Sequence, residues 1–247
     1  MPFTFSHPAI ILPLTFLPNK WFSLTGLVIG SLAPDFEYFI RMRIKSEFSH
    51  SFFGVFGFSL PIGIILCFVF HVIIRDTLFD NLPHFLKVRL ISFKKFNWWN
   101  YFKENWIIVS ISIIIGAFSH LLWDSFTHEH GYFVKNNTLL LKSIILLKTE
   151  VTFYKILQHS STIIGGVILL IALYKLPKTK VIDKREKTFY WFYFSVITFI
   201  IIFTRLFSKA ENTDYGTIIV TILSAGMISS ILTPGVLIIN TRAKSVQ

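Results

Sequence analysis

The chain has 247 residues, of which 53% are hydrophobic, 17% aromatic and only 15% charged. This composition excludes a soluble globular protein and is typical of an integral membrane protein. The net charge of +11 would suit a nucleic-acid partner, but the basic residues gather in alternate loops. That distribution indicates membrane topology and anionic lipid, and we expect no nucleic-acid partner.

The apolar stretches of the chain predict its membrane-spanning helices. The first, residues 9–33, is interrupted by Pro13, Pro18 and Lys20, so it either spans once or forms a broken hairpin buried in protein. Five later stretches approach or exceed the roughly 20 residues that cross a hydrocarbon layer of about 30 Å. They are 52–74, 106–126, 162–176, 189–207 and 216–240. The sequence therefore predicts an all-α, polytopic helical membrane protein with five or six transmembrane helices.

The basic loops set the expected topology. Lysine and arginine concentrate in residues 75–105, in 177–188 and in the C-terminal tail, which the positive-inside rule assigns to the cytoplasm. The loops 34–51, 127–161 and 208–215 then face the opposite side. We expect a multi-pass protein of the bacterial inner membrane, in contact with the lipid bilayer; the sequence leaves the oligomeric state open.

Ionisable residues stand in the 106–126 stretch, where a bilayer disfavours them. His120, Asp124 and the following His128 fall at i, i+4 and i+8, on one face of a helix. A charge in the middle of a membrane helix costs about 2.5–3.5 kcal/mol on insertion scales, so such residues are usually functional. An imidazole and a carboxylate four residues apart can hold one divalent metal. His120 and His128 are about 12 Å apart along a helix, so either Asp124 bridges two ions or the helix breaks near Thr127.

Other candidate ligands are expected at the same membrane face, because they begin or end neighbouring spans. His7 can join them only if residues 9–33 form a hairpin. The expected metal ligands are His7, Asp35, His50, His120, Asp124, His128 and His159, and the expected catalytic carboxylates are Asp35 and Asp124.

Each candidate also has a purely structural interpretation. His120 and Asp124 could form a buried hydrogen-bonded pair that ties two helices together. Asp35 could cap the helix that starts near Phe36. His50, His128 and His159 could be interfacial histidines. Glu37 is adequately explained as a first-turn carboxylate that is favoured by the helix dipole.

Four segments carry a family resemblance: residues 1–8 (MPFTFSHP), 30–38 (GSLAPDFEY), 116–128 (GAFSHLLWDSFTH) and 158–161 (QHSS). Together they resemble an uncharacterised family of bacterial membrane proteins, domain of unknown function 4184, over roughly residues 1–175.

A more distant likeness concerns the order of the ligands. An early His, Gly-x-x-x-Pro-Asp, a His-Ser pair and Gly-x-x-x-His-x-x-x-Asp is similar to membrane-bound metal-dependent hydrolases and, in ligand order alone, to zinc-dependent phospholipase C. The chain departs from this pattern late in the sequence, because His159 is followed four positions on by Ile163 rather than Glu. The resemblance implies that the protein binds divalent metal, with zinc as the favoured ion. Because of this departure we do not expect the full set of three metal ions.

The leading hypothesis is a membrane-embedded hydrolase with two divalent metals at the extracytoplasmic face. It would act on a phosphoester, such as a phospholipid or another lipid-linked phosphate. Residues 1–175 would form the domain that carries the metal site, and residues 176–247 would add two transmembrane helices to the same bundle. The alternative is a non-enzymatic membrane protein, either an ion or proton pathway or a metal-binding scaffold.

Overall fold

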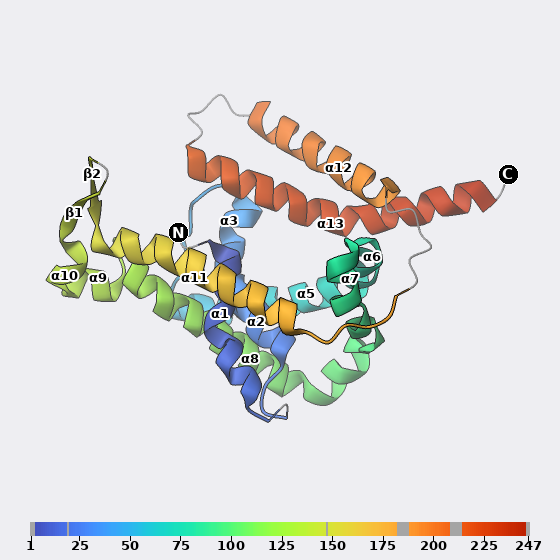
Figure 1. The fold of residues 1–247 in the computed structure, drawn as a ribbon, viewed down its shortest axis with the longest axis horizontal. Coiled ribbons are helices and arrows are strands. Elements are labelled where there is room, and N and C mark those ends of the chain that lie inside the picture. The colour runs from blue at the N-terminus through green and yellow to red at the C-terminus, as the bar shows by residue number, and fades with distance from the viewer. Residues whose placement is uncertain (1–2, 19, 147, 182–187, 208–213, 246–247) are drawn as a thin grey trace. The chain divides into compact units, whose positions relative to one another are not determined.

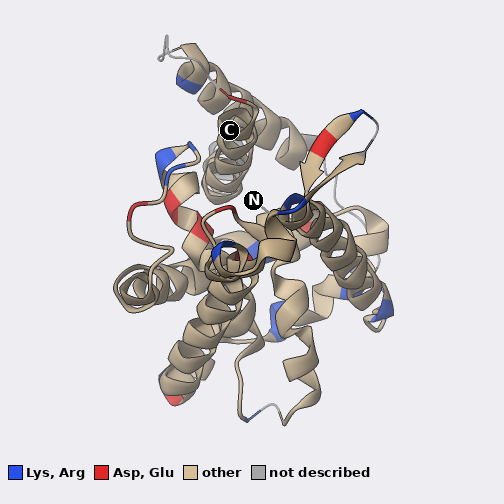
Figure 2. Cartoon of the chain, turned by 90° about the vertical axis from the view of Figure 1, so that its left-hand side faces the viewer, with Lys and Arg blue, Asp and Glu red and all other residues tan. Residues whose placement is uncertain are grey.

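The computed structural model describes residues 3–18, 20–146, 148–181, 188–207 and 214–245. Among these, five helical segments are long and apolar enough to cross a membrane: Phe52–Asn81, Trp98–Asn136, Phe153–Lys175, Phe189–Phe207 and Tyr215–Ile239. Helices account for nearly all of the secondary structure (Figure 1). Charged residues are rare along the long helices, as Figure 2 shows. The prediction of an all-α, multi-pass membrane protein is confirmed.

The N-terminal apolar stretch does not cross as a single helix. It consists of η1 (Thr4–Ser6), α1 (Pro8–Ile11), η2 (Leu12–Phe16) and α2 (Leu24–Leu32). Pro8 and Pro13 each stand in the first turn of a short helix, the position that proline tolerates. The Ser23 hydroxyl caps α2 by accepting a hydrogen bond from the Gly26 amide. Because α1 packs against α2, the broken-hairpin alternative is the observed one.

The rest of the chain follows as longer elements. A 3-10 turn, η3 (Ala33–Asp35), joins α2 to α3 (Phe36–Arg41). The second apolar stretch runs through α4 (Phe52–Gly54), η4 (Val55–Ser59), α5 (Leu60–Phe68), η5 (Val69–Ile74) and α6 (Arg75–Asn81), with η4 and η5 π-helical. Then come α7 (His84–Leu90), η6 (Ile91–Lys95) and α8 (Trp98–Thr127), whose backbone is non-helical at Asn105.

Beyond α8 the chain forms α9 (Tyr132–Asn136), α10 (Thr138–Leu141) and a hairpin of β1 (Ser143–Leu146) and β2 (Thr149–Thr152). The two strands are antiparallel, with Ser143 opposite Thr152 and Leu146 opposite Thr149. The last three helices are α11 (Phe153–Lys175), α12 (Thr188–Phe207) and α13 (Tyr215–Ser245). In α12 and α13, Thr198 donates a hydrogen bond to the Ser229 hydroxyl at 2.8 Å.

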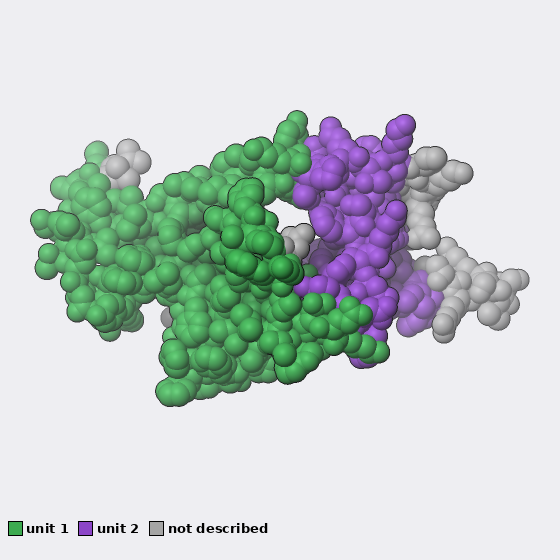
Figure 3. Space-filling model, turned by 90° about the horizontal axis from the view of Figure 1, so that it is seen from below, with its two compact units in different colours: residues 1–35, 47–65, 102–175 green, residues 36–46, 66–101, 176–247 purple. Residues whose placement is uncertain are grey.

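The chain divides into two compact units, coloured separately in Figure 3. The first comprises Met1–Asp35, Glu47–Ile65 and Phe102–Lys175, and the second comprises Phe36–Ser46, Leu66–Tyr101 and Leu176–Gln247. All seven predicted metal ligands belong to the first unit, so the candidate site can be described within that unit alone.

Within the first unit, α2 and α8 approach each other through glycine. A Cβ on Gly30 would overlap the backbone of Ile113, and a Cβ on Gly116 would overlap the Leu27 carbonyl and lie 2.6 Å from the Ser31 nitrogen. Small residues permit such backbone contact between membrane helices. This contact sets the place of every group that α2 and η3 present to the C-terminal turns of α8.

Candidate metal centre

Four separate segments supply the central ligands. His7 lies between η1 and α1, Asp35 ends η3, and His50 precedes α4. His120 and Asp124 lie in the last two turns of α8. His120 and Asp35 are completely buried, and His7 and Asp124 are nearly so. In a solvent-exposed loop these groups would be hydrated at little cost in free energy, whereas here these four are held inside the protein.

Two imidazole nitrogens and two carboxylate oxygens alternate around a common point. Asp35 Oδ1 lies 3.4 Å from His120 Nε2 and 3.3 Å from His50 Nε2. Asp124 Oδ2 lies 3.3 Å from His120 Nε2 and 3.6 Å from His50 Nε2. A tetrahedral zinc ion with bonds of about 2.0–2.1 Å places its ligands roughly 3.3–3.4 Å apart. Three of these four separations have the length of one edge of a zinc tetrahedron, and the ligand atoms that all lie within 4.8 Å of one another form two three-residue sets rather than one set of four.

The surrounding hydrogen bonds turn the ligand atoms toward that point. His120 Nδ1 lies 2.8 Å from the Ser31 carbonyl oxygen. A carbonyl can only accept, so Nδ1 carries the proton and Nε2 faces the carboxylates. The Thr4 hydroxyl donates a hydrogen bond to Asp35 Oδ2 at 2.5 Å. The other carboxylate oxygen, Oδ1, therefore faces the metal centre. Such outer contacts orient ligands in metal sites and raise their basicity.

Several buried atoms at the centre make no hydrogen bond within the described part of the chain. They are Asp35 Oδ1, His120 Nε2, Asp124 Oδ1 and both ring nitrogens of His7. Each buried polar atom without a hydrogen bond costs about 1–3 kcal/mol, so a concentration of them calls for a partner. A cation is the partner that suits lone pairs on nitrogen and carboxylate oxygen together.

Two of the ligands outside the spanning segments, His7 and Asp35, hold the charge states that metal binding needs. Burial, followed by the neighbouring charge of His120, lowers the pKa of His7 from 6.5 to about 3. For Asp35 burial works against ionisation, but the adjacent His120 outweighs it and keeps the carboxyl pKa well below its usual range. At neutral pH His7 is therefore a neutral imidazole and Asp35 is a carboxylate, the forms that coordinate metals.

Asp124 presents its second oxygen to two further histidines. Asp124 Oδ1 lies 3.6 Å from His7 Nε2 and 3.4 Å from His128 Nδ1. The His7 ring stacks on the His120 ring with centroids 3.8 Å apart. Since α8 ends at Thr127, His128 has left the helix. Of the two expected alternatives, the structure shows the helix end at Thr127, and the two oxygens of Asp124 face different imidazoles.

Among the described residues there are two sets of three ligands in which all the ligand atoms lie within 4.8 Å of one another. They are His7, Asp35 and His120, and His50, His120 and Asp124. His159 belongs to neither set and is exposed on α11, so the structure does not bring this predicted ligand to the centre. The reason is rotational: Ser160 and Ser161 line a pocket on one side of α11, and each residue turns by about 100° from the one before it.

The structure also decides two of the structural interpretations. The Asp35 carboxylate accepts its hydrogen bond from Thr4, a residue distant in sequence, and does not cap α3. Glu37 stands in the first turn of α3 and pairs with Arg41 at 2.9 Å, one turn later. Glu37 therefore stays a structural carboxylate, as the sequence indicated.

Sequence reasoning missed the residues that orient the ligands. Thr4 and the Ser31 carbonyl have no chemical signature of their own, and only the fold shows that they touch Asp35 and His120. One signal was present: Gly26 and Gly30 have the four-residue spacing that permits close helix packing. A Cβ on Gly26 would lie 2.8 Å from Ser112 of α8. This spacing could have predicted that α2 packs on α8.

A family model described as Domain of unknown function (DUF4184) matches residues 1–238. The chain belongs to this family. The match extends past the roughly 175 residues that carry the resemblance in the sequence, through α12 and into α13 as far as residue 238. No curated protein and no solved structure matches the chain. The family description names no activity, so a functional argument has to start from the metal centre itself.

Proposed function

We propose that this protein is a membrane-embedded hydrolase that uses a divalent metal, with zinc as the favoured ion, to cleave a phosphoester. The observation that carries the proposal is the convergence of His50, His120, Asp35 and Asp124 from three separate segments, with imidazole–carboxylate separations of 3.3–3.6 Å. Imidazole ligands favour zinc over magnesium and calcium, which prefer all-oxygen sites. In such a site a divalent ion would acidify water and stabilise the charge that develops on a phosphoryl group.

The exposure of the ligands supports a division of roles between the two carboxylates. The side chains of Asp35 and His120 are fully enclosed, whereas those of Asp124, His50 and His128 are 11%, 20% and 29% exposed. A substrate would therefore approach from the side of His50 and His128. Asp35, held by Thr4, is suited to bind metal, and Asp124 is the carboxylate placed to accept a proton at Oδ1.

The membrane side of the site follows from the distribution of basic residues. The basic loop 75–105 precedes and enters α8 at its N-terminal end, while His120 and Asp124 lie near the C-terminal end of the same helix. By the positive-inside rule this supports an extracytoplasmic centre in a bacterial inner membrane. At that level a phosphoester substrate would be a phospholipid or another lipid-linked phosphate.

The non-enzymatic alternatives make different demands. A proton or ion pathway needs ionisable groups spaced along the membrane normal, whereas these gather within a few ångströms at one end of α8. A metal-binding scaffold would use the same ligands without turnover. Only an activity measurement separates the scaffold from the hydrolase.

The test combines metal content with turnover. Protein purified in mild detergent should contain at least one zinc or manganese per chain by elemental analysis, and His120→Ala should lose it. His159→Ala is the matched control and should keep the metal, because His159 is exposed and outside both ligand sets. The loaded protein should hydrolyse bis(p-nitrophenyl) phosphate. Protein without bound metal would refute the proposal, and bound metal without hydrolysis of soluble or lipid phosphoesters would favour the scaffold.

A further inference from the structure

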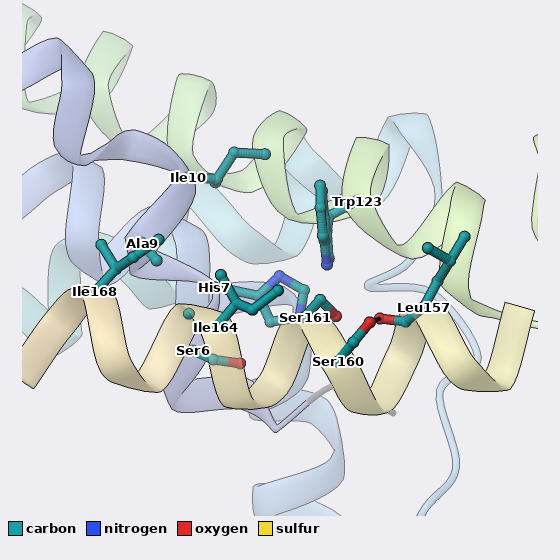
Figure 4. A pocket seen from close by; sticks show the side chains of 11 residues that line it. Ser6, His7, Ala9, Ile10, Trp123, Leu157, Ser160, Ser161, Ile164 and Ile168 are labelled. Carbon is teal, nitrogen blue, oxygen red and sulfur yellow. Dashed lines mark hydrogen bonds between the residues drawn. The ribbon is translucent and has the colours of Figure 1, made fainter.

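An apolar pocket adjoins the metal centre inside the first unit. Its volume is about 260 Å³. Figure 4 shows side chains from the N-terminal helices and α8 facing a row of side chains along α11. The apolar part of the wall is made by Ala9, Ile10, Trp123, Leu157, Ile164 and Ile168.

The few hydroxyls in the wall are already satisfied by their own backbone. Ser6 donates to the Phe3 carbonyl at 2.6 Å, Ser160 to the Leu157 carbonyl at 3.2 Å, and Ser161 to the Gln158 carbonyl at 3.0 Å. Such local bonds remove the need for an external hydrogen-bond partner. The pocket therefore offers an occupant apolar contact and almost no polar recognition.

His7 and the indole N–H of Trp123 are the exceptions, and His7 joins the pocket to the metal centre. It lines the pocket and also lies 3.6 Å from Asp124 Oδ1, with its ring stacked on His120. Both of its buried ring nitrogens lack a hydrogen bond. The pocket thus has an apolar body along α11 and a polar end at the proposed site of phosphoester cleavage.

From this arrangement we infer that the pocket holds one hydrocarbon chain of a lipid-linked phosphoester whose phosphate is cleaved at the metal centre. The inference rests on the proposed function and specifies how that site would select its substrate. A molecule with an ionic phosphate at one end and a hydrocarbon chain at the other matches the two ends of the space.

The position of α11 supports a chain rather than a soluble apolar ligand. This helix is one of the five spanning segments, and its pocket-lining residues Ile164 and Ile168 remain 58% and 42% exposed. Their outer surfaces meet lipid in a membrane, so a hydrocarbon chain could enter sideways without passing through water. Gly165 fixes the width of the pocket, because a Cβ there would lie 2.9 Å from the Ser6 carbonyl oxygen.

The first arm of the test requires no turnover. The full chain is reconstituted in phosphatidylglycerol vesicles that contain a small fraction of the same lipid with a diazirine at mid-chain, irradiated and mapped by peptide mass spectrometry. Label should concentrate on residues 157–168 and 9–10. Ile168→Trp fills the pocket and should reduce this label at least fivefold. Gly166→Trp is the matched control, since a Cβ on Gly166 meets nothing within 4 Å, and should leave the label unchanged.

The second arm compares substrates of different chain length on metal-loaded protein. Ile168→Trp should slow hydrolysis of a long-chain lipid phosphoester about tenfold relative to bis(p-nitrophenyl) phosphate, and Gly166→Trp should not. Label spread evenly around α11 and insensitive to Ile168→Trp would mean surrounding lipid only and would overturn the inference.

The outcomes also separate this inference from the proposed function. A metal-loaded, active protein with no chain-length preference would leave the hydrolase standing and refute the chain-binding pocket. Pocket-specific label on a protein that binds no metal would support chain binding and refute its role in substrate selection. A variant that fails to fold would be recognised by its melting temperature in detergent, and Ile164→Trp then replaces Ile168→Trp.

Discussion

The contact between α2 and α8 predicts that a methyl group that touches no ligand side chain will weaken metal binding. In Gly116→Ala the new Cβ would overlap the Leu27 carbonyl and lie 2.6 Å from the Ser31 nitrogen. Ordinary contact begins near 3.4 Å, so the backbone at Ser31 has to move by about 0.8 Å. Ser31 is the residue whose carbonyl holds His120 Nδ1.

The size of the effect follows from that movement. A displacement of about 0.8 Å along the bond would stretch the 2.8 Å contact between His120 Nδ1 and the Ser31 oxygen to about 3.6 Å, too long for a hydrogen bond. Loss of such an outer contact typically costs 10–100-fold in metal affinity. Overpacking of the helix contact should also lower the free energy of unfolding by about 1–3 kcal/mol.

Zinc titration of detergent-purified, metal-stripped protein measures the affinity, and thermal melting measures the stability. Gly166→Ala is the matched control, because its Cβ meets nothing within 4 Å, and it should behave like the unmodified chain. If Gly116→Ala binds zinc as tightly as Gly166→Ala does, the Ser31 carbonyl does not orient His120 and the reasoning fails.

Three further predictions concern other parts of the molecule. Thr4→Val removes the hydroxyl that donates to Asp35 and should weaken zinc binding about tenfold without changing helix content; an unchanged zinc affinity would count against this. A chelator should lower the melting temperature of the metal-loaded protein, with a loss of about 2.7 kcal/mol in the free energy of unfolding if free metal stood at 100 times its dissociation constant, and should have no effect on Asp35→Asn. Asp214 caps α13 by accepting from the Thr217 amide at 2.9 Å, and hydrogen bonds from Thr217 lower the pKa of its carboxyl. The stabilisation by this cap is present above a pH of about 4 and is lost as pH falls through the lowered pKa. Asp214→Ala should therefore lower the free energy of unfolding by about 0.5 kcal/mol at pH 7 and leave it unchanged in strong acid. Equal losses at both pH values would exclude the cap.

Much of the fold could be predicted because the bilayer limits what an apolar sequence can do. All five stretches between residues 52 and 240 overlap helical segments capable of spanning, since backbone polar groups in hydrocarbon must be satisfied within the helix. The N-terminal stretch was ambiguous because prolines permit both a span and a hairpin. The packing of α1 on α2 and α11 resolves it, and local sequence does not encode that contact.

The candidate site was only partly predictable, for a related reason. His120 and Asp124 stand out because each is costly in an apolar helix, and their spacing fixes their shared face. His50 and Asp35 could be placed at the right level of the membrane but not at the right distance. His159 was expected at the centre but lies exposed on α11, because the rotation of α11 depends on tertiary contacts, including that of Gly165 with Ser6. The membrane level of each ligand follows from the topology, whereas the distances between the ligands follow from the packing of the helices.

Charge balance connects the metal centre to the phosphoester. Asp35 and Asp124 together contribute two negative charges if the surrounding imidazoles are neutral ligands, so one divalent ion makes the buried set electrically neutral. A second divalent ion beside Asp124 Oδ1, His7 and His128 would leave a net charge of about +2 in a partly enclosed site, which low dielectric strongly disfavours. An anionic phosphodiester, with one negative charge, would lower that excess only to about +1. Under the proposed function, charge balance therefore favours one resident ion, which leaves Asp124 Oδ1 free to accept a proton.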